Sequence, residues 1–438
     1  ASEASSTSET AEASEASSAS EASSTSETSE TSETAEASEA SSASEASSAS
    51  EASSASEASS ATAEASVAVP VVAEPKAFEY TIGINTWGSG VPVLDMFGDA
   101  KEFALTTLGC TVNRMSDDFT ADKELTNVKN MCSAGVDGMV IQAAAVSTVP
   151  QIAAEAAGAK IPFAFDVFVG ENDALEKLAD ENEYYCGAID LDMVYDGEVI
   201  AQMAYDAGCR KAVCIGGNIG DNNMDQRSEG FTTKFTELGG EVLSEARCTD
   251  NSECLTKASD MLSANMDADC IYCFVGDYVE GSRTALDNLG LTDQVKMFVS
   301  CVDEATAALI AEGTVEGGND GISMASYISS TLVINYLQGN KIVDENGKAP
   351  RLSTHPFQVT KDNAEAYSAV FFQQDSPFTA DMLQALVADG VTYQDYADLV
   401  EDLNLEYILA ANGVEVPEAE TEETSETSEA SSASEASS

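Results

Sequence analysis

Histidine and tryptophan are almost absent from this sequence of 438 residues, which has one of each, His355 and Trp87. A zinc site built from cysteine and histidine is therefore not expected. No nucleophile motif accompanies His355, and no glycine-rich phosphate loop follows the first predicted strand in the required form. The sequence argues against an enzyme, and we expect neither a metal nor a cofactor.

Basic residues are absent from both ends of the chain, because all 19 Lys and Arg lie between Lys76 and Lys361. The 21 Glu at the two ends leave 56 acidic against 19 basic residues between them, so the central body carries a charge of −37. This charge argues against nucleic acid or an anionic membrane as a partner. Dispersed carboxylates usually serve solubility, although an acidic field could also concentrate cationic solutes or Ca²⁺.

The ends also lack the side chains that build a core. Residues 1–66 consist almost entirely of Ala, Ser, Glu and Thr in near-copies of ASEASS and TSET, and the same words return after Pro417. Such segments bury too little apolar surface to offset the entropy of ordering. We predict a disordered acidic linker over residues 1–77 and a disordered tail over residues 414–438.

No apolar run approaches the roughly 18 residues that span a bilayer. No signal peptide precedes the acidic leader, so we expect Ala1 to begin a mature chain from which a signal peptide has been removed. A lipidated cysteine just before Ala1 in the precursor would make the leader a spacer at the cell surface. The preferred hypothesis is an extracellular lipoprotein.

Cysteine is abundant, with ten residues. Cys214 and Cys301 lie in apolar stretches, where small buried side chains are expected. Cys248 and Cys254, in the polar segment CTDNSEC, are the best disulfide candidates. The CIYC sequence at residues 270–273 resembles a redox motif, but it falls inside a predicted strand rather than at a helix start, so a redox role is not favoured.

From Tyr80 onwards, short β-branched runs alternate with amphipathic segments, which is typical of a parallel sheet covered by helices. The predicted strands begin at Thr81, Thr111, Gly138, Phe163, Ala212, Cys270 and Met297. The predicted helices cover residues 101–108, 123–134, 149–157, 194–207, 226–238, 254–263 and 279–289. Ligands of such sheets bind beyond the carboxyl ends of the strands, so polar residues that follow strands are the site candidates.

Residues 377–413 carry apolar side chains at helical spacing, such as Met382, Leu383 and Leu386. We predict a C-terminal helical extension that packs on the body. Its tyrosines are expected to be packing residues.

Six stretches together resemble one family. They are DFTADKELTNVKNMCSAGVDGMVIQ at residues 118–142, AKIPFAFD ending at Asp166, RSEGF at residues 227–231, CFVGDY around Asp277, CVDEAT around Asp303 and THPFQVTKDNAEAY at residues 354–367. From about Tyr80 to Tyr367 the chain is similar to the type I periplasmic binding proteins, the ribose and galactose binders and their relatives among the lac-type repressors.

The resemblance implies an α/β fold of two Rossmann-like lobes, with three hinge crossovers and solute trapped as the lobes close. It assigns residues 78–190 and 322–353 to lobe 1, and residues 191–321 and 354–376 to lobe 2. The implied crossovers lie near Asp190, Asp320 and Thr354.

The resemblance also implies a ligand site. Arg227 matches the family's Arg-x-x-Gly-Phe position, whose guanidinium grips solute oxygens, and Asp166 and Asp303 match carboxylates at strand ends. Gln142 ends a strand where the family often has Asn, and Asp277 follows Gly where the family usually has Asn-Asp. Asn223, from the loop before Arg227, and Asp320, at the second crossover, complete the polar set.

Trp87 is the remaining site candidate. The family's first loop commonly reads Asn-Pro-aromatic, whereas this chain has VPVL from Val91. Trp87 lies between polar and glycine residues four positions earlier, so it is favoured as a stacking platform for a sugar ring or base. The alternative is a tryptophan that packs within a lobe.

The leading prediction is a monomeric solute-binding protein of an ABC-type importer that delivers a small polar solute, a sugar in the favoured version, to a membrane permease. A nucleoside or a cationic metabolite remains an alternative ligand, and a sensory receptor for a signalling partner remains an alternative role. A repressor is disfavoured, because no helix-turn-helix precedes the first lobe.

Overall fold

The computed structural model describes residues 75–143, 145–167, 173–219, 221–249 and 251–415. The predicted disordered segments lie almost wholly outside the described residues. Lys76, which falls within the predicted linker, is bonded to the body. Its Nζ lies 2.9 Å from Gln338 Oε1 and 2.8 Å from Asp389 Oδ1.

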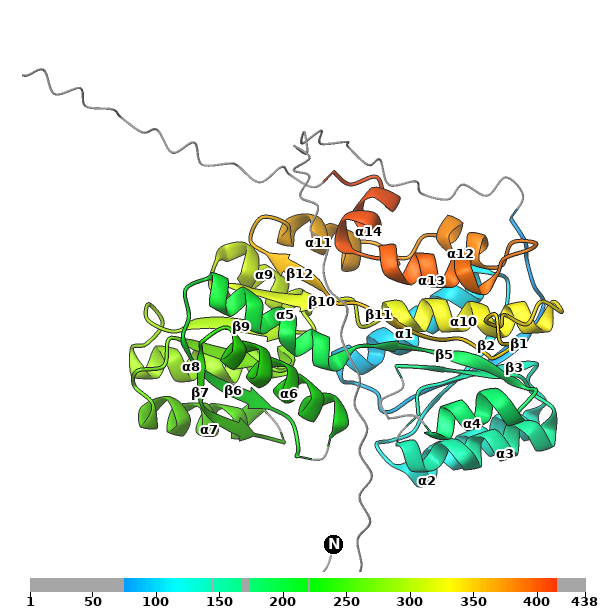
Figure 1. Ribbon diagram of the computed structural model, residues 1–438, viewed down its shortest axis with the longest axis horizontal. Helices are drawn as coiled ribbons and strands as arrows, with labels where there is room; N and C mark the ends of the chain where they lie inside the picture. Colours follow the sequence, from blue (N-terminus) through cyan, green and yellow to red (C-terminus); the bar gives the residue numbers. More distant parts are fainter. Residues whose placement is uncertain (1–74, 144, 168–172, 220, 250, 416–438) are drawn as a thin grey trace, which may run out of the picture. The chain divides into compact units, whose positions relative to one another are not determined.

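The first sheet contains six parallel strands in the order β11-β5-β4-β3-β1-β2. Helices α1 and α10 cover one face and α2, α3 and α4 the other (Figure 1). The strands are β1 (Thr81–Thr86), β2 (Thr111–Ser116), β3 (Gly138–Ile141), β4 (Phe163–Asp166), β5 (Tyr185–Leu191) and β11 (Arg351–Thr354). The helices are α1 (Pro92–Thr107), α2 (Ala121–Ala134), the short η1 (Val146–Thr148), α3 (Val149–Ala159), α4 (Asp173–Glu181) and α10 (Met324–Leu337).

The second sheet has the order β12-β10-β9-β8-β6-β7 and is parallel except for the pair of β10 and β12. Helices α5 and α6 pack together, as do α7 and α8. The strands are β6 (Lys211–Gly216), β7 (Glu241–Arg247), β8 (Cys270–Cys273), β9 (Lys296–Ser300), β10 (Gly317–Asp320) and β12 (Phe357–Thr360). The helices are α5 (Met193–Asp206), α6 (Asn222–Glu237), α7 (Asn251–Ala264), the short η2 (Gly276–Tyr278), α8 (Val279–Leu289), α9 (Glu304–Glu312) and α11 (Ala364–Phe371).

The CIYC sequence forms β8, a central strand buried on both faces. Cys270 and Tyr272 belong to the apolar cluster beside α5 and α6, while Ile271 and Cys273 belong to the cluster on the other face. Parallel strands covered on both faces need apolar side chains at every position, which explains the unbroken apolar sequence.

The chain crosses between the sheets from β5 to α5, from β10 to α10 and from β11 to β12. The predicted fold class, two β/α lobes joined by three crossovers, is confirmed. Within the described residues, no helix has the length and apolar character that a bilayer span requires.

Several elements differ from the predictions. Helix α1 begins at Pro92 rather than near Lys101, because proline suits the first position of a helix while the VPVL sequence was taken as loop. Strand β5 was not predicted, since Gly187, at φ +133°, interrupts its apolar run. Strand β7 was missed because it is a partly exposed edge strand with a polar sequence.

Three helices form the predicted C-terminal extension: α12 (Ala380–Leu386), α13 (Tyr393–Asp402) and α14 (Leu405–Ala411). Helix α12 contacts α1 and α10 and α13 contacts β11, all in the first lobe, whereas α14 contacts α11 in the second. Tyr396 of α13 is buried, and its hydroxyl lies 2.6 Å from Thr331 Oγ1 and 2.9 Å from Asn335 Nδ2 on α10. The extension is therefore an integral part of the folded body.

Replacing Tyr396 with phenylalanine tests this attachment. Loss of the hydroxyl removes hydrogen bonds to two buried side chains, so Tyr396→Phe should lower the free energy of unfolding by about 1–2 kcal/mol in a urea titration. Tyr393→Phe on the same helix is the matched control, expected within about 0.5 kcal/mol of wild type. Equal stability of the two variants would show that the Tyr396 hydroxyl does not anchor the extension.

Candidate functional site

Side chains from both lobes line a pocket beyond the carboxyl ends of β8 and β9. The first turn of α1 supplies an apolar side, and the loops after β8 and β9 supply two carboxylates among smaller residues. Its lining residues are Pro92, Val93, Met96, Val275, Gly276, Asp277, Cys301 and Asp303. The carboxyl end of a parallel sheet is where ligands of open α/β sheets bind, so the observed pocket is at the expected place.

Two predicted site residues, Asp277 and Asp303, meet in this pocket. Asp303 is the N-cap of α9, and its Oδ1 accepts a hydrogen bond from the Thr306 backbone N–H at 2.7 Å. The pKa of Asp277 is raised by burial and by the neighbouring charge of Asp303. A Cβ at Gly276 would lie 2.9 Å from Asp303 Oδ2, so the glycine gives this carboxylate room. Within the described part of the chain, no protein donor bonds the Asp277 carboxylate.

Arg227 lies behind this pocket, on α6. It is 1% exposed, its Nε donates to Asp196 Oδ1 at 3.0 Å, and one terminal nitrogen lies 2.9 Å from Cys301 Sγ. Burial is the largest single effect and disfavours the guanidinium charge, but Asp196, Cys301 and Tyr272 together outweigh burial and raise the pKa of Arg227. The structure shows a guanidinium held by protein groups, and it touches the pocket through Cys301. Direct contact of Arg227 with solute stays a prediction.

The buried ion pair between Arg227 and Asp196 is expected to contribute to the free energy of unfolding. Arg227→Met should lower the free energy of unfolding by about 3–5 kcal/mol, because it leaves the Asp196 carboxylate buried without its counter-charge. Adding Asp196→Asn removes that charge and keeps an acceptor for the Ser300 hydroxyl, 2.5 Å away, so the double variant should recover part of the loss. Denaturant unfolding of both proteins checks this, and a single variant within 1 kcal/mol of wild type would contradict it.

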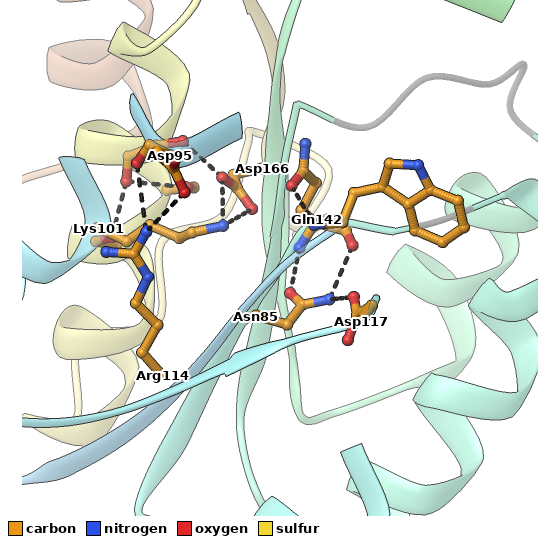
Figure 2. Close-up of polar contacts among 11 residues, drawn as sticks. Asn85, Asp95, Lys101, Arg114, Asp117, Gln142 and Asp166 are labelled. Atoms are coloured by element: carbon orange, nitrogen blue, oxygen red, sulfur yellow. Dashed lines mark hydrogen bonds and ion pairs between the residues drawn. The ribbon is translucent and has the colours of Figure 1, made fainter. Parts of the chain in front are cut away.

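Asp166, at the end of β4, forms the corresponding pair in the first lobe (Figure 2). Its two oxygens lie 3.0 and 2.9 Å from Lys101 Nζ, and Oδ2 also accepts from the Ser326 hydroxyl at 2.6 Å. Both charged side chains are fully buried. Burial lowers the pKa of Lys101, and the Asp166 charge opposes that effect. The carboxylate is thus held by α1 and α10, and its predicted contact with solute is untested.

Gln142 and Trp87 belong to a second polar cluster of the first lobe, beside β1. Figure 2 shows Gln142 in this cluster, next to Asn85 and Asp117. Gln142 Oε1 accepts from the Trp87 backbone N–H at 2.9 Å, and the Asn85 amide bonds Asp117 and the Gln142 backbone. The Trp87 ring packs edge-on against the half-exposed Phe119, with centroids 6.3 Å apart. Gln142 therefore holds the loop that carries Trp87, and stacking of a solute on the indole stays a prediction.

The last two predicted site residues lie in the second lobe. Asn223 is in the first turn of α6, and its Oδ1 is buried without a hydrogen-bond partner among the described residues. Asp320 ends β10 and is 2% exposed, and its Oδ2 accepts from the Tyr367 hydroxyl at 2.7 Å. Burial raises the pKa of Asp320 to about 6. Neither residue lines the pocket.

The Asp320 pKa predicts a pH effect on stability. The folded-state pKa of Asp320 lies above the unfolded value of 3.8, so the folded state holds this proton more tightly. The contribution of Asp320 to the free energy of unfolding is therefore complete below about pH 4 and is lost as the pH rises through about 6. Asp320→Asn keeps the acceptor for Tyr367 and should flatten the fall in melting temperature between pH 4 and 7. The exposed Asp293→Asn is the control and should leave the slope unchanged. An Asp320→Asn slope equal to that of wild type would rule out the raised pKa.

All cysteines in the described residues are free thiols. Cys254 lies in α7 rather than in a polar loop, and both Cys248 and Cys254 are buried with their thiols in hydrogen-bonding contact. The disulfide between them stays a prediction.

Sequence reasoning missed the partners of the site. Lys101 and Asp196 gave no signal, because each lies in an amphipathic helix where a charged residue is expected on the solvent side. Cys301 directly follows β9, so its place at a strand end could have marked it. The apolar turn at Pro92 and Val93 was missed with the start of α1.

Two β/α lobes, with a pocket between the first turn of α1 and the ends of β8 and β9, define the class of two-lobed solute-binding folds. A family model described as "Periplasmic binding protein domain" matches residues 82–341, and the chain belongs to this family. A search of curated proteins by sequence found no match.

Solved structures share the fold at low identity. The periplasmic binding component of the arabinose ABC transporter from Shewanella sp. ANA-3, bound to L-arabinofuranose, is 18% identical with a TM-score of 0.57, over 67% of this chain and 96% of that chain. An ABC transporter solute-binding protein from Actinobacillus succinogenes 130z with D-allose is 16% identical with a TM-score of 0.59, over 66% and 100%. One from Bacillus halodurans C-125 with myo-inositol is 16% identical with a TM-score of 0.55, over 68% and 99%.

Proposed function

We propose that this chain is the solute-binding component of an ABC-type importer and that it captures a small polyhydroxylated solute, such as a sugar, in the pocket between its lobes. The family supports a binding role, and the three structural relatives were solved with L-arabinofuranose, D-allose and myo-inositol bound. Delivery to a membrane permease follows from that role. Capture by lobe closure needs no covalent chemistry.

The observation that carries the proposal is the two-sided pocket. Pro92, Val93 and Met96 present apolar surface from one lobe, while Asp277 and Asp303 present carboxylates from the other. The pocket has a volume of only about 10 Å³, so the two lobes must move apart to admit a solute. A sugar ring has C–H groups on its faces and hydroxyl donors around its edge, so it could then contact both sides at once. Hydrogen bonds from hydroxyls to carboxylates are charge-assisted and stronger than those to neutral acceptors.

The other predicted site residues have supporting roles in the proposed binding of solute. Arg227 would act on solute through Cys301 unless closure frees a guanidinium nitrogen, and the unpaired Asn223 Oδ1 offers an acceptor near the start of α6. Trp87 would stack on a solute that extends towards the β1 loop. The proposal also includes a monomeric protein, the lobe limits that the resemblance implies, and a lipid anchor that holds the protein at the cell surface.

A cationic solute is the second candidate. Asp277 and Asp303 lie close enough for the charge of Asp303 to raise the pKa of Asp277, and the Arg227 guanidinium behind the pocket already pairs with Asp196. An amine placed between the two carboxylates would relieve their repulsion. This arrangement favours an amino sugar or another small polar amine over an anionic solute.

A thermal-shift screen of sugars, polyols, nucleosides and amines tests the function. A ligand at 100 times its dissociation constant should stabilise the protein by about 2.7 kcal/mol. We expect a sugar, polyol or amino sugar to raise the melting temperature, and turnover of the stabilising compound would overturn the binding role.

Variants of the two pocket carboxylates then test the site with the solute so found. Asp303→Asn retains the helix cap, since Asn is an equally good N-cap, and should weaken binding about 10-fold or more through loss of a charge-assisted bond. Asp277→Asn should have a similar effect, and the exposed Asp293→Asn is the matched control. Calorimetric titration measures all three. Unchanged affinity in both pocket variants would place the solute elsewhere.

A further inference from the structure

A second cluster of reactive side chains lies at the opposite end of the second sheet. Cys209 precedes β6, and Asp269 and Cys270 stand at the start of β8. Their two Sγ atoms and one carboxylate oxygen lie within 4.8 Å of one another. Because β6 and β8 are parallel neighbours with Ala212 opposite Cys270, this cluster lies at the amino ends of the strands, away from the solute pocket.

The backbone holds the three groups in place. The Asp269 carboxylate accepts hydrogen bonds from the backbone N–H groups of Arg210 and Lys211, at 2.8 and 2.9 Å. Cys209 is therefore tied to Asp269 through the residues that follow it, and Cys270 through the peptide bond. Each carboxylate oxygen keeps further lone pairs. Hydrogen bonds that orient a ligating carboxylate in this way are a regular feature of metal sites.

We propose that Cys209, Cys270 and Asp269 form a binding site for a thiophilic divalent cation of the zinc class. Two thiolates, one carboxylate and a water would complete a tetrahedral set. With Zn–S bonds of about 2.3 Å, the two sulfurs would lie about 3.8 Å apart, so the three groups need only a small contraction. The proposal is independent of solute binding.

The electrical surroundings suit such a site. Two thiolates and a carboxylate around a divalent cation carry one net negative charge. Lys296, which stands opposite Cys270 in the β8–β9 register and is bonded to Glu316 Oε1 at 2.6 Å, places a cation beside the site. Cys209 and Cys270 are buried and Asp269 is partly exposed, which leaves the carboxylate side as the entry route.

A bare thiol pair elsewhere in the chain supplies the control. Cys248 and Cys254 are also buried and in thiol contact, yet among the described residues they are not part of a three-donor group with a carboxylate. If paired thiols alone were sufficient, both pairs would bind the ion. If the Asp269 carboxylate is required, only the first pair will.

Cobalt titration of the full chain tests the proposal, after reduction and removal of the reductant. We expect one Co²⁺ per chain, a thiolate-to-cobalt charge-transfer band and displacement by Zn²⁺. Cys209→Ser and Cys270→Ser should each abolish the band, and Asp269→Asn should weaken binding about 10–100-fold. Cys248→Ser should bind as wild type does.

Alkylation of the wild-type protein gives a readout that does not depend on folding of a variant. In mild denaturant, where buried thiols become transiently accessible, Zn²⁺ should slow the labelling of Cys209 and Cys270 by iodoacetamide in peptide maps, and leave the labelling of Cys248 and Cys254 unchanged. Absence of a band with all ten thiols reduced, or protection of all thiols alike, would overturn the proposal. A disulfide between Cys209 and Cys270 in the protein as isolated from its native host would also overturn it.

Discussion

Among the described residues, each lobe buries one cation against one carboxylate, and these two ion pairs position both sides of the pocket. In the first lobe, Asp166 at the end of β4 binds Lys101 of α1 and Ser326 of α10. In the second, Asp196 of α5 binds Arg227 of α6 and Ser300 of β9. The first pair fixes α1, whose opening turn forms the apolar side of the pocket. The second fixes the end of β9, from which Cys301 and Asp303 reach the polar side.

Buried ion pairs are costly to form and more costly to break, since the surviving partner keeps its charge in a poorly solvated place. They therefore restrict how the strand ends beside the pocket can rearrange. Arg227 shows this restriction most clearly. The resemblance places it at a position that binds solute, yet in this structure its guanidinium is bonded to Asp196 and Cys301. The carboxylates of Asp277 and Asp303 are then left as the charged groups of the pocket.

The fold could be predicted from the sequence because the spacing of apolar residues and the composition of each segment indicate which side chains are buried. Apolar runs such as that of β8 and amphipathic helices such as α8 are local signals, whereas β7, at the sheet edge, has a mixed pattern and was missed. Asp277 and Asp303 were found because they follow strands. The partners of Arg227 and Asp166 were not, since Asp196 and Lys101 come from helices 31 and 65 residues away. The cluster around Cys209 and Cys270 is non-local in the same way, and only the β6–β8 pairing brings it together.

The most direct test of the solute pocket is a crystal structure of the chain with the solute that stabilises it most. We predict the solute between the first turn of α1 and the ends of β8 and β9, with hydroxyl or amine groups within hydrogen-bonding distance of Asp277 and Asp303. Solute bound elsewhere, with neither carboxylate in contact, would contradict the role assigned to this pocket.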